Sequence, residues 1–176
     1  MPKPSSSTYP PNFDKYIQLV SEDDINTAFK NQTPEAESFF KAITEQQSLF
    51  KYAEEKWTIK EILQHLIDAE RIFAYRALAF ARKDKSILPS FDENGYAANS
   101  HANNRGWEEL IVEFLAVRKS IEILFNSFSE EDLNTSGKAS NYEITVLALG
   151  YITVGHAAHH MNIIRERYLE DLKLKI

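Results

Sequence analysis

Three histidines give this chain a set of side chains that could bind a metal ion. His156 and His160 are four residues apart, so on a helix they lie on one face, one turn apart. Two imidazoles at this spacing can bind a single ion, and His65, which lies 91 residues upstream of His156, could supply a third nitrogen if the two helices pack together. Three protein ligands leave a coordination position open for water or substrate, as in catalytic metal sites.

The direction in which these histidines point follows from the helical period. His156 and His160 share their side of the helix with Leu149 and Ile163, which predicts that they face the interior or the mouth of a bundle. His159 lies on a shoulder of the same helix, where it is poorly placed to bind the same ion. An inward-facing histidine can also be a core residue that only forms hydrogen bonds, so a structural role is the alternative.

His65 lies near one edge of the apolar side of its helix. We expect the solvent side of this helix to carry Lys60, Gln64 and Arg71. Glu70 is expected to form a surface or structural ion pair, as is Arg71, rather than to act in acid–base chemistry.

Composition excludes several classes of protein. A chain of 176 residues with 43% hydrophobic residues predicts one domain with a substantial core. The net charge of -6 and the absence of a basic cluster argue against nucleic-acid binding. There is no cysteine, so an ion must be held by nitrogen and oxygen. No apolar run is long enough for a membrane span and no secretory signal is visible, which predicts a cytoplasmic protein.

Four long stretches have helical periodicity. The first follows Ser21 as a predicted N-cap and reaches about residue 43, with a kink or a restart capped by Thr33 where Pro34 interrupts it. The second begins at the capping box of Thr58 and Glu61 and continues to about residue 82. The others cover about 107–128 and 145–169. A short helical turn is expected after residue 129, and residues 139–145 could pair locally at most.

These stretches predict an all-α protein, an antiparallel four-helix bundle over residues 16–176. Residues 1–15 hold four of the six prolines within their first eleven positions, which predicts a flexible N-terminal arm. The longest connection, residues 83–106, is polar and could reach over the mouth of the bundle, so Asp92 and Tyr96 are candidate catalytic residues. Arg76 and Arg167 lie on the faces of the histidines and are candidates for binding a carboxylate of a cofactor, with a structural ion pair as the alternative.

Three blocks of sequence resemble the DinB-like family of bacterial helical bundles. The first comprises Lys-Trp-Thr-Ile-Lys-Glu at 56–61 and His-Leu-Ile-Asp-Ala-Glu-Arg at 65–71. The second is Phe91-Asp92, and the third is Gly-His-Ala-Ala-His-His at 155–160 with Arg-Glu-Arg-Tyr-Leu at 165–169. Their order and spacing match the family over about residues 20–170.

The resemblance implies an up-down-down-up four-helix bundle, often a homodimer, that binds a divalent metal through His65, His156 and His160. His159 matches a histidine of the family that is not a ligand. Known members include bacillithiol and mycothiol transferases and a mycothiol-dependent maleylpyruvate isomerase, and many members have no known reaction.

The expected function is therefore that of a metal-dependent enzyme acting on a small molecule. Two reactions remain open, which are transfer of a low-molecular-weight thiol to an electrophile and hydrolysis. Nickel, zinc, manganese and iron all accept nitrogen and oxygen ligands. The alternative is a bundle without catalytic activity that binds a small ligand and has a structural or vestigial metal site.

Overall fold

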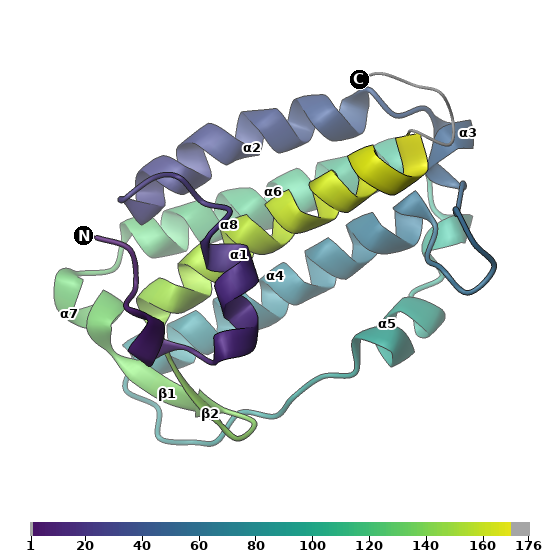
Figure 1. The fold of residues 1–176 in the computed structure, drawn as a ribbon. Helices are drawn as coiled ribbons and strands as arrows, with labels where there is room; N and C mark the ends of the chain where they lie inside the picture. Colours follow the sequence, from purple (N-terminus) through teal and green to yellow (C-terminus); the bar gives the residue numbers. More distant parts are fainter. Residues whose placement is uncertain (1, 170–176) are drawn as a thin grey trace.

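The computed structural model describes residues 2–169 and contains four long helices. They are α2 (Ile25–Lys41), α4 (Ile59–Ala81), α6 (Trp107–Asn126) and α8 (Val146–Ile163), and α8 continues into a π-helical segment, η4 (Ile164–Leu169). Each packs against two others in the order α2, α6, α4, α8 and back to α2. Helices α2 and α8 run in one direction and α4 and α6 in the other (Figure 1). The predicted all-α bundle with up-down-down-up topology is confirmed.

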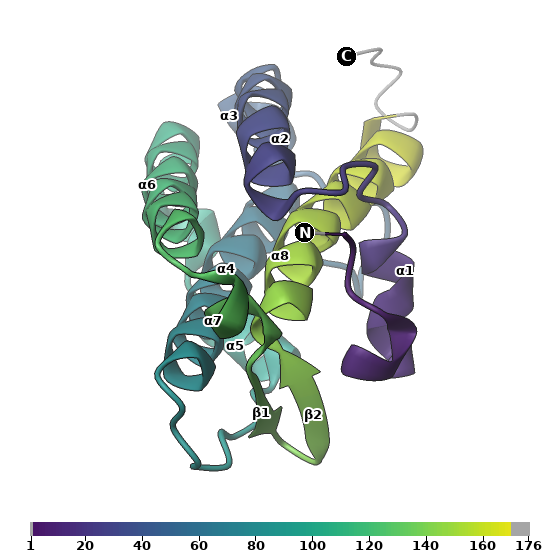
Figure 2. The same ribbon diagram turned by 90° about the vertical axis from the view of Figure 1, so that its left-hand side faces the viewer.

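Shorter elements close the ends and one side of this bundle. Helix α1 lies outside α8 in the view from the end of the bundle (Figure 2). The two strands form an antiparallel hairpin in which Gly137 pairs with Ile144, so the weak local pairing expected near residue 139 is a real hairpin. The short elements are η1 (Ser6–Thr8), η2 (Pro11–Phe13), α1 (Asp14–Ile17), α3 (Glu45–Ser48), α5 (Glu93–Asn99), η3 (Ala102–Asn104), α7 (Glu130–Asn134), β1 (Ser136–Ala139) and β2 (Tyr142–Thr145).

The helix ends follow local capping chemistry. Helix α4 begins with the predicted capping box, in which the Thr58 hydroxyl accepts a hydrogen bond from the Glu61 backbone N–H. Helix α2 begins later than expected, because its N-cap is Asp24 and not Ser21; the Asp24 carboxylate accepts from the Thr27 N–H at 2.8 Å.

Pro34 does not divide α2. The helix is continuous from residue 25 to 41, and the Thr33 hydroxyl donates to the Phe29 carbonyl one turn back instead of capping a new helix. Of the two predicted alternatives, a kink or a restart, the restart was therefore wrong. A proline inside a helix costs about 3 kcal/mol, and the burial of Phe29 and Ala36 on either side offsets this cost.

A buried polar network links all four long helices. Arg118 of α6 donates to both carboxylate oxygens of Glu70 on α4 and, at 2.6 Å, to the amide oxygen of Gln32 on α2. Gln32 in turn donates to the Val154 carbonyl of α8 at 2.5 Å. Arg118 and Glu70 have no exposed surface. Glu70 is thus a structural ion-pair partner, and the network lies between two separate apolar clusters of the core.

The connection from α4 to α6 covers one face of α4. Lys60 is only 2% exposed, and its ammonium donates to the Arg105 carbonyl at 2.6 Å and to the Glu45 carboxylate. Gln64 is also buried and accepts from the Arg105 guanidinium at 2.7 Å. The expectation that Lys60 and Gln64 face solvent was wrong, because helical periodicity does not show which face a distant segment covers. Arg71 is half exposed, as expected.

The N-terminal segment packs on the bundle. Tyr9 is buried, and its hydroxyl donates to the Asp14 carboxylate at 2.8 Å. The predicted boundary between arm and bundle at residue 15 falls inside α1, and the flexibility of residues 1–15 stays a prediction. None of the helices in residues 2–169 combines the length and the apolar character that a membrane span requires.

Candidate metal centre

The three histidines singled out in the sequence meet between α4 and α8. The Nε2 atom of His156 lies 3.1 Å from the Nε2 atom of His65 and 3.1 Å from that of His160. One nitrogen from each ring lies within 4.8 Å of the other two. Three nitrogens held ~2.1 Å from one ion at tetrahedral angles would be separated by about 3.4 Å. The observed cluster therefore has the dimensions of a three-nitrogen metal site.

Helix packing explains how these residues converge. His156 and His160 occupy successive turns of α8, and the buried Ala157 and Met161 beside them hold this part of α8 in the core. His65 projects from α4, which packs directly against α8. The common face predicted from the four-residue spacing and the approach of His65 are both present in the structure.

Burial keeps these rings neutral. It lowers the pKa of His65 to about 4, an effect that the nearby negative charge of Glu93 opposes. Burial, followed by the neighbouring histidines, lowers the pKa of His160 to about 3 and that of His156 well below its usual value. A neutral imidazole has one N–H, so His156 Nε2 cannot donate to both neighbours at once. Three neutral rings that converge in this way can each turn a nitrogen lone pair toward a bound cation.

Aromatic side chains orient the histidines. The ring centroid of Tyr16 lies 5.1 Å from that of His156 and 5.2 Å from that of His159, in edge-on contacts. Trp57 lies 5.0 Å from His65. Histidine ligands commonly donate their second nitrogen to a carboxylate or a carbonyl, but within residues 2–169 the buried Nδ1 atoms of His156 and His160 have no hydrogen-bond partner. Ring packing therefore takes the place of such hydrogen bonds at these two residues.

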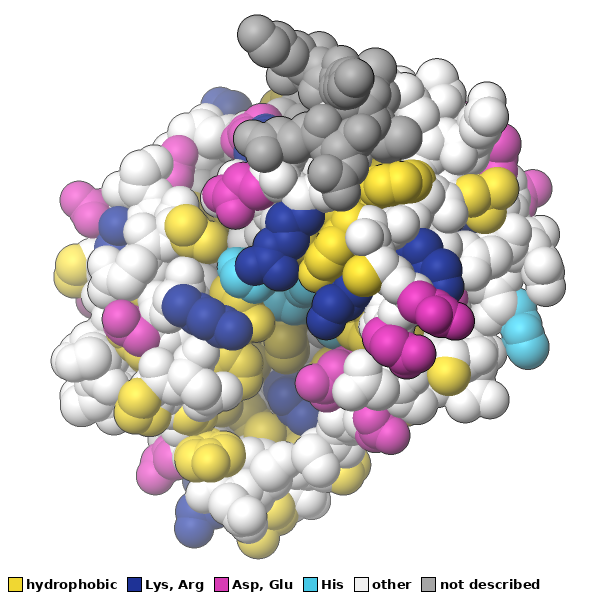
Figure 3. Space-filling view, turned by 45° about the vertical axis from the view of Figure 1, so that its right-hand side comes forward, with side chains coloured by type: hydrophobic (Ala, Val, Ile, Leu, Met, Phe, Trp, Pro, Cys, Tyr) yellow, Lys and Arg dark blue, Asp and Glu magenta, His cyan; other side chains and the backbone are white. Residues whose placement is uncertain are grey.

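The cluster lies at the bottom of an open cleft. The cleft has a volume of about 460 Å³, and Figure 3 shows histidine side chains in a hollow with basic side chains around it. Lys15 and Arg76 are the basic residues that line the cleft, and Glu93 is the one carboxylate among its described lining residues. The other lining residues are Asn12, Phe13, Tyr16, Trp57, Phe73, Phe91, His65, His156, His159 and His160. The site is accessible to a small molecule.

The long connection borders this cleft, but Asp92 and Tyr96 do not line it. The Asp92 carboxylate caps α5 by accepting from the Asn94 N–H at 3.1 Å. Both residues are exposed and line a separate depression with Asp68. The residues on either side of Asp92 line the histidine cleft instead; Phe91 is half-buried and Glu93 is exposed. The segment was predicted correctly, but the side chains that it directs into the cleft differ from those predicted.

The two candidate arginines are placed differently. Arg76 is buried and lines the cleft, and its Nη2 atom donates to the Pro89 carbonyl at 2.8 Å. Arg167 is exposed on η4, where it donates to the Tyr52 hydroxyl at 3.3 Å. Arg167 does not line the cleft. Its charge still affects the site: burial lowers the pKa of His159 most, and the charges of Lys15 and Arg167 lower it further.

Sequence reasoning missed the contribution of α1 to the site. Lys15 and Tyr16 reach the cleft because α1 lies directly against α8 at Gly155. A Cβ atom at Gly155 would lie 2.0 Å from the Tyr16 carbonyl oxygen. A glycine inside a helix and next to a candidate ligand was the available signal of a close approach.

Comparison with known proteins gives the family of this chain. A family model described as the DinB superfamily matches residues 28–164. The chain belongs to the DinB superfamily. A search of the curated proteins finds no match.

Two solved structures share the fold. One carries the description "YfiT from Bacillus subtilis is a probable metal-dependent hydrolase with an unusual four-helix bundle topology". Its sequence is 18% identical to this one, and the TM-score is 0.67. The match covers 98% of this chain and 94% of that chain. The other, a mycothiol-dependent maleylpyruvate isomerase, is 9% identical with a TM-score of 0.66, and the match covers 78% of this chain and 58% of that one. At these identities the likeness concerns the fold.

Proposed function

We propose that this protein is a metal-dependent hydrolase of a small molecule, with His65, His156 and His160 as ligands of one divalent cation. The observation that carries this proposal is the convergence of three neutral imidazole nitrogens at the bottom of an open cleft. The donor set fits zinc, nickel, manganese or iron, and a three-ligand site leaves a position open. When bound, such an ion supplies Lewis-acid activation of water or of a substrate oxygen.

Glu93 is our candidate for the general base. It is the carboxylate among the described lining residues of the cleft, and its charge acts on His65. A carboxylate in this position can take a proton from the attacking water and return it to the leaving group. Asp92, which the sequence suggested for this role, does not line the cleft and is assigned no chemical step; its carboxylate caps α5. Tyr96 lies on the same helix, in the neighbouring depression, and is assigned no chemical step.

Metal content and ester hydrolysis test this proposal. The protein should be purified without a histidine tag and analysed for metals, and hydrolysis of 4-nitrophenyl acetate should be measured. We expect one divalent ion per chain. Glu93→Gln should lower kcat by about 100-fold or more with unchanged metal content, since general-base catalysis contributes about that much.

Asp92→Asn is the matched control, because it changes the adjacent carboxylate, which does not line the cleft. We expect it to change kcat by less than about threefold, since it affects only the cap of α5. Full activity in Glu93→Gln would remove Glu93 from the mechanism. Metal bound at full occupancy after loss of a ligand histidine would contradict the three-histidine site.

Thiol transfer is the second candidate, and the basic residues around the cleft favour it. Lys15 and Arg76 line the cleft, and Arg167 lies close enough to act on His159. These side chains could bind the carboxylates of a low-molecular-weight thiol, and one structure with this fold is described as mycothiol-dependent. Conjugation of a thiol to an electrophile that persists in Glu93→Gln would favour transfer over hydrolysis.

Assembly and a passive role are tested separately. The resemblance to DinB-like proteins leads us to propose a homodimer, which sedimentation equilibrium would detect. A metal that does not exchange and a site without access for water would instead support the bundle without catalytic activity.

A further inference from the structure

Arg76 is a buried cation for which the described chain supplies no anion. The residue is 8% exposed, and its one hydrogen bond in residues 2–169 goes to the neutral carbonyl of Pro89. Burial lowers its pKa, and within residues 2–169 no charged side chain opposes that effect. By contrast, the fully buried Arg118 is paired with Glu70. Arg76 therefore presents a positive charge without a counter-charge at the wall of the cleft, and an anionic group of a ligand could pair with it.

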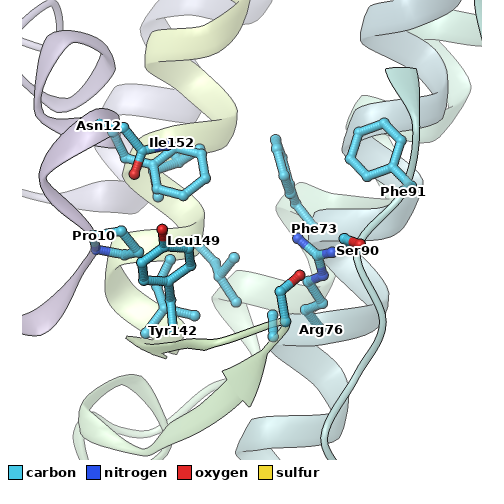
Figure 4. A pocket seen from close by; sticks show the side chains of 13 residues that line it. Pro10, Asn12, Phe73, Arg76, Ser90, Phe91, Tyr142, Leu149 and Ile152 are labelled. Carbon is cyan, nitrogen blue, oxygen red and sulfur yellow. The ribbon is translucent and has the colours of Figure 1, made fainter. Parts of the chain in front are cut away.

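An apolar pocket lies next to this guanidinium. Figure 4 shows Arg76, Ser90, Phe73 and Phe91 on one side of the pocket, facing Leu149, Ile152, Tyr142, Pro10 and Asn12 on the other. The pocket has a volume of about 180 Å³. A cavity of about 150 Å³ lined by Leu, Ile and Phe accommodates a benzene molecule, so this pocket can hold a phenyl-sized or branched aliphatic group.

The pocket and the histidine cleft adjoin each other and have five lining residues in common. Phe13, Phe73, Arg76 and Phe91 line both, together with Asn12. Arg76 therefore lies at the junction of the two spaces. A ligand with its anionic group at Arg76 can direct an apolar group into the pocket and a reactive group toward the histidines.

We propose that the substrate is an organic carboxylate with a phenyl-sized or branched apolar group. Its carboxylate pairs with Arg76, and its apolar group fills the pocket between α8, the hairpin and the N-terminal segment. This inference rests on the proposed function, since it assigns a substrate class to the same site. Guanidinium groups pair with carboxylates and phosphates alike. We choose a carboxylate because one cation in apolar surroundings matches a single negative charge.

The test uses four probes and two variants. Binding of 3-phenylpropionate, its neutral amide 3-phenylpropionamide, acetate and phenyl phosphate is measured by isothermal titration calorimetry. The protein is used as purified and after removal of metal with a chelator, because a carboxylate could otherwise bind the metal. We expect 3-phenylpropionate to bind at least tenfold more tightly than the amide, acetate and phenyl phosphate, in both forms of the protein.

Arg76→Met should weaken binding of 3-phenylpropionate at least tenfold and leave the amide within twofold. Arg71→Met is the matched control, because Arg71 is on the same helix but is half exposed and paired with Glu113 at 2.6 Å. This control should bind all four probes as the unchanged protein does. If Arg76→Met does not fold, the comparison of acid with amide on the unchanged protein decides the question.

Equal binding of acid and amide, or unchanged binding of the acid in Arg76→Met, would overturn the inference. Tighter binding of phenyl phosphate would overturn the choice of a carboxylate. The two proposals fail separately, because the measurement on metal-stripped protein does not depend on the metal site. A chain that binds no metal but distinguishes acid from amide would contradict the proposed function alone.

Discussion

Replacement of Gly155 by alanine should displace α1 from the site without removing the histidine cluster. The added Cβ atom would lie 2.0 Å from the Tyr16 carbonyl oxygen and 2.5 Å from its carbonyl carbon. Ordinary contact begins at 3.4 Å, so α1 and α8 must separate by about 1.4 Å. Both obstacles are backbone atoms, so a rotamer change cannot relieve the clash.

The energetic balance favours local detachment over global unfolding. Overpacking costs about 1–3 kcal/mol, and the higher helix propensity of alanine offsets about 1 kcal/mol. A net loss of up to about 2 kcal/mol in the free energy of unfolding is expected. Because α1 has only four residues, from Asp14 to Ile17, its release from α8 is the easiest relief. Lys15 and Tyr16 would then leave the cleft.

Hydrogen exchange and ligand binding provide the assay. The Gln18 N–H, which donates to the Asp14 carbonyl at 3.0 Å, should exchange at least about tenfold faster in Gly155→Ala. Metal content should be unchanged, because the histidines belong to α4 and α8. Affinity for 3-phenylpropionate should fall, because the segment that precedes α1 lines the apolar pocket.

Gly150→Ala is the control on the same helix. Its Cβ atom would meet side-chain atoms of Phe125 at 2.6 Å and of Ile25 at 2.9 Å, on the side of α8 that faces α2 and α6. This variant should lose stability but leave the exchange rate of the Gln18 N–H as it is in the unchanged protein. Unchanged exchange of the Gln18 N–H in Gly155→Ala would refute the reasoning, because it would show that the bundle absorbs the extra methyl group without moving α1.

Three further results are expected. His160→Ala should lose the bound metal in elemental analysis yet keep the helical circular dichroism spectrum, because apolar burial supplies most of the folding free energy; loss of both would indicate a structural ion. Glu70→Gln should lower the free energy of unfolding in urea by about 3–5 kcal/mol, because it leaves Arg118 buried without a counter-charge. The metal-free protein should lose stability against urea as the pH falls from about 6.5 toward 4. Burial lowers the pKa of His65 to about 4 and that of His160 to about 3, so the unfolded chain takes up these protons first. A free energy of unfolding that does not change over this pH range would contradict buried neutral rings.

Local sequence information determined the helices and one part of the site. The capping box at Thr58 and the unbroken run after it located α4 to within about one residue at each end, because a helix begins where a side chain can accept the first free N–H groups. The four-residue spacing placed His156 and His160 on one face, because the helical period follows from the backbone hydrogen bonds. His65 reaches the other two histidines only because α4 packs against α8. This packing was expected from the predicted bundle and from the family resemblance.

Tertiary structure alone decided which other side chains reach the histidines. The sequence placed the connection after α4 near the site, but it did not show that the exposed Glu93 lines the cleft while Asp92 caps α5. The sequence also could not predict three other features: the burial of Lys60, the approach of α1 to Gly155, and the lack of an anion of residues 2–169 next to Arg76. Each depends on contacts between segments far apart in the chain, whereas helical periodicity records only neighbours within about two turns.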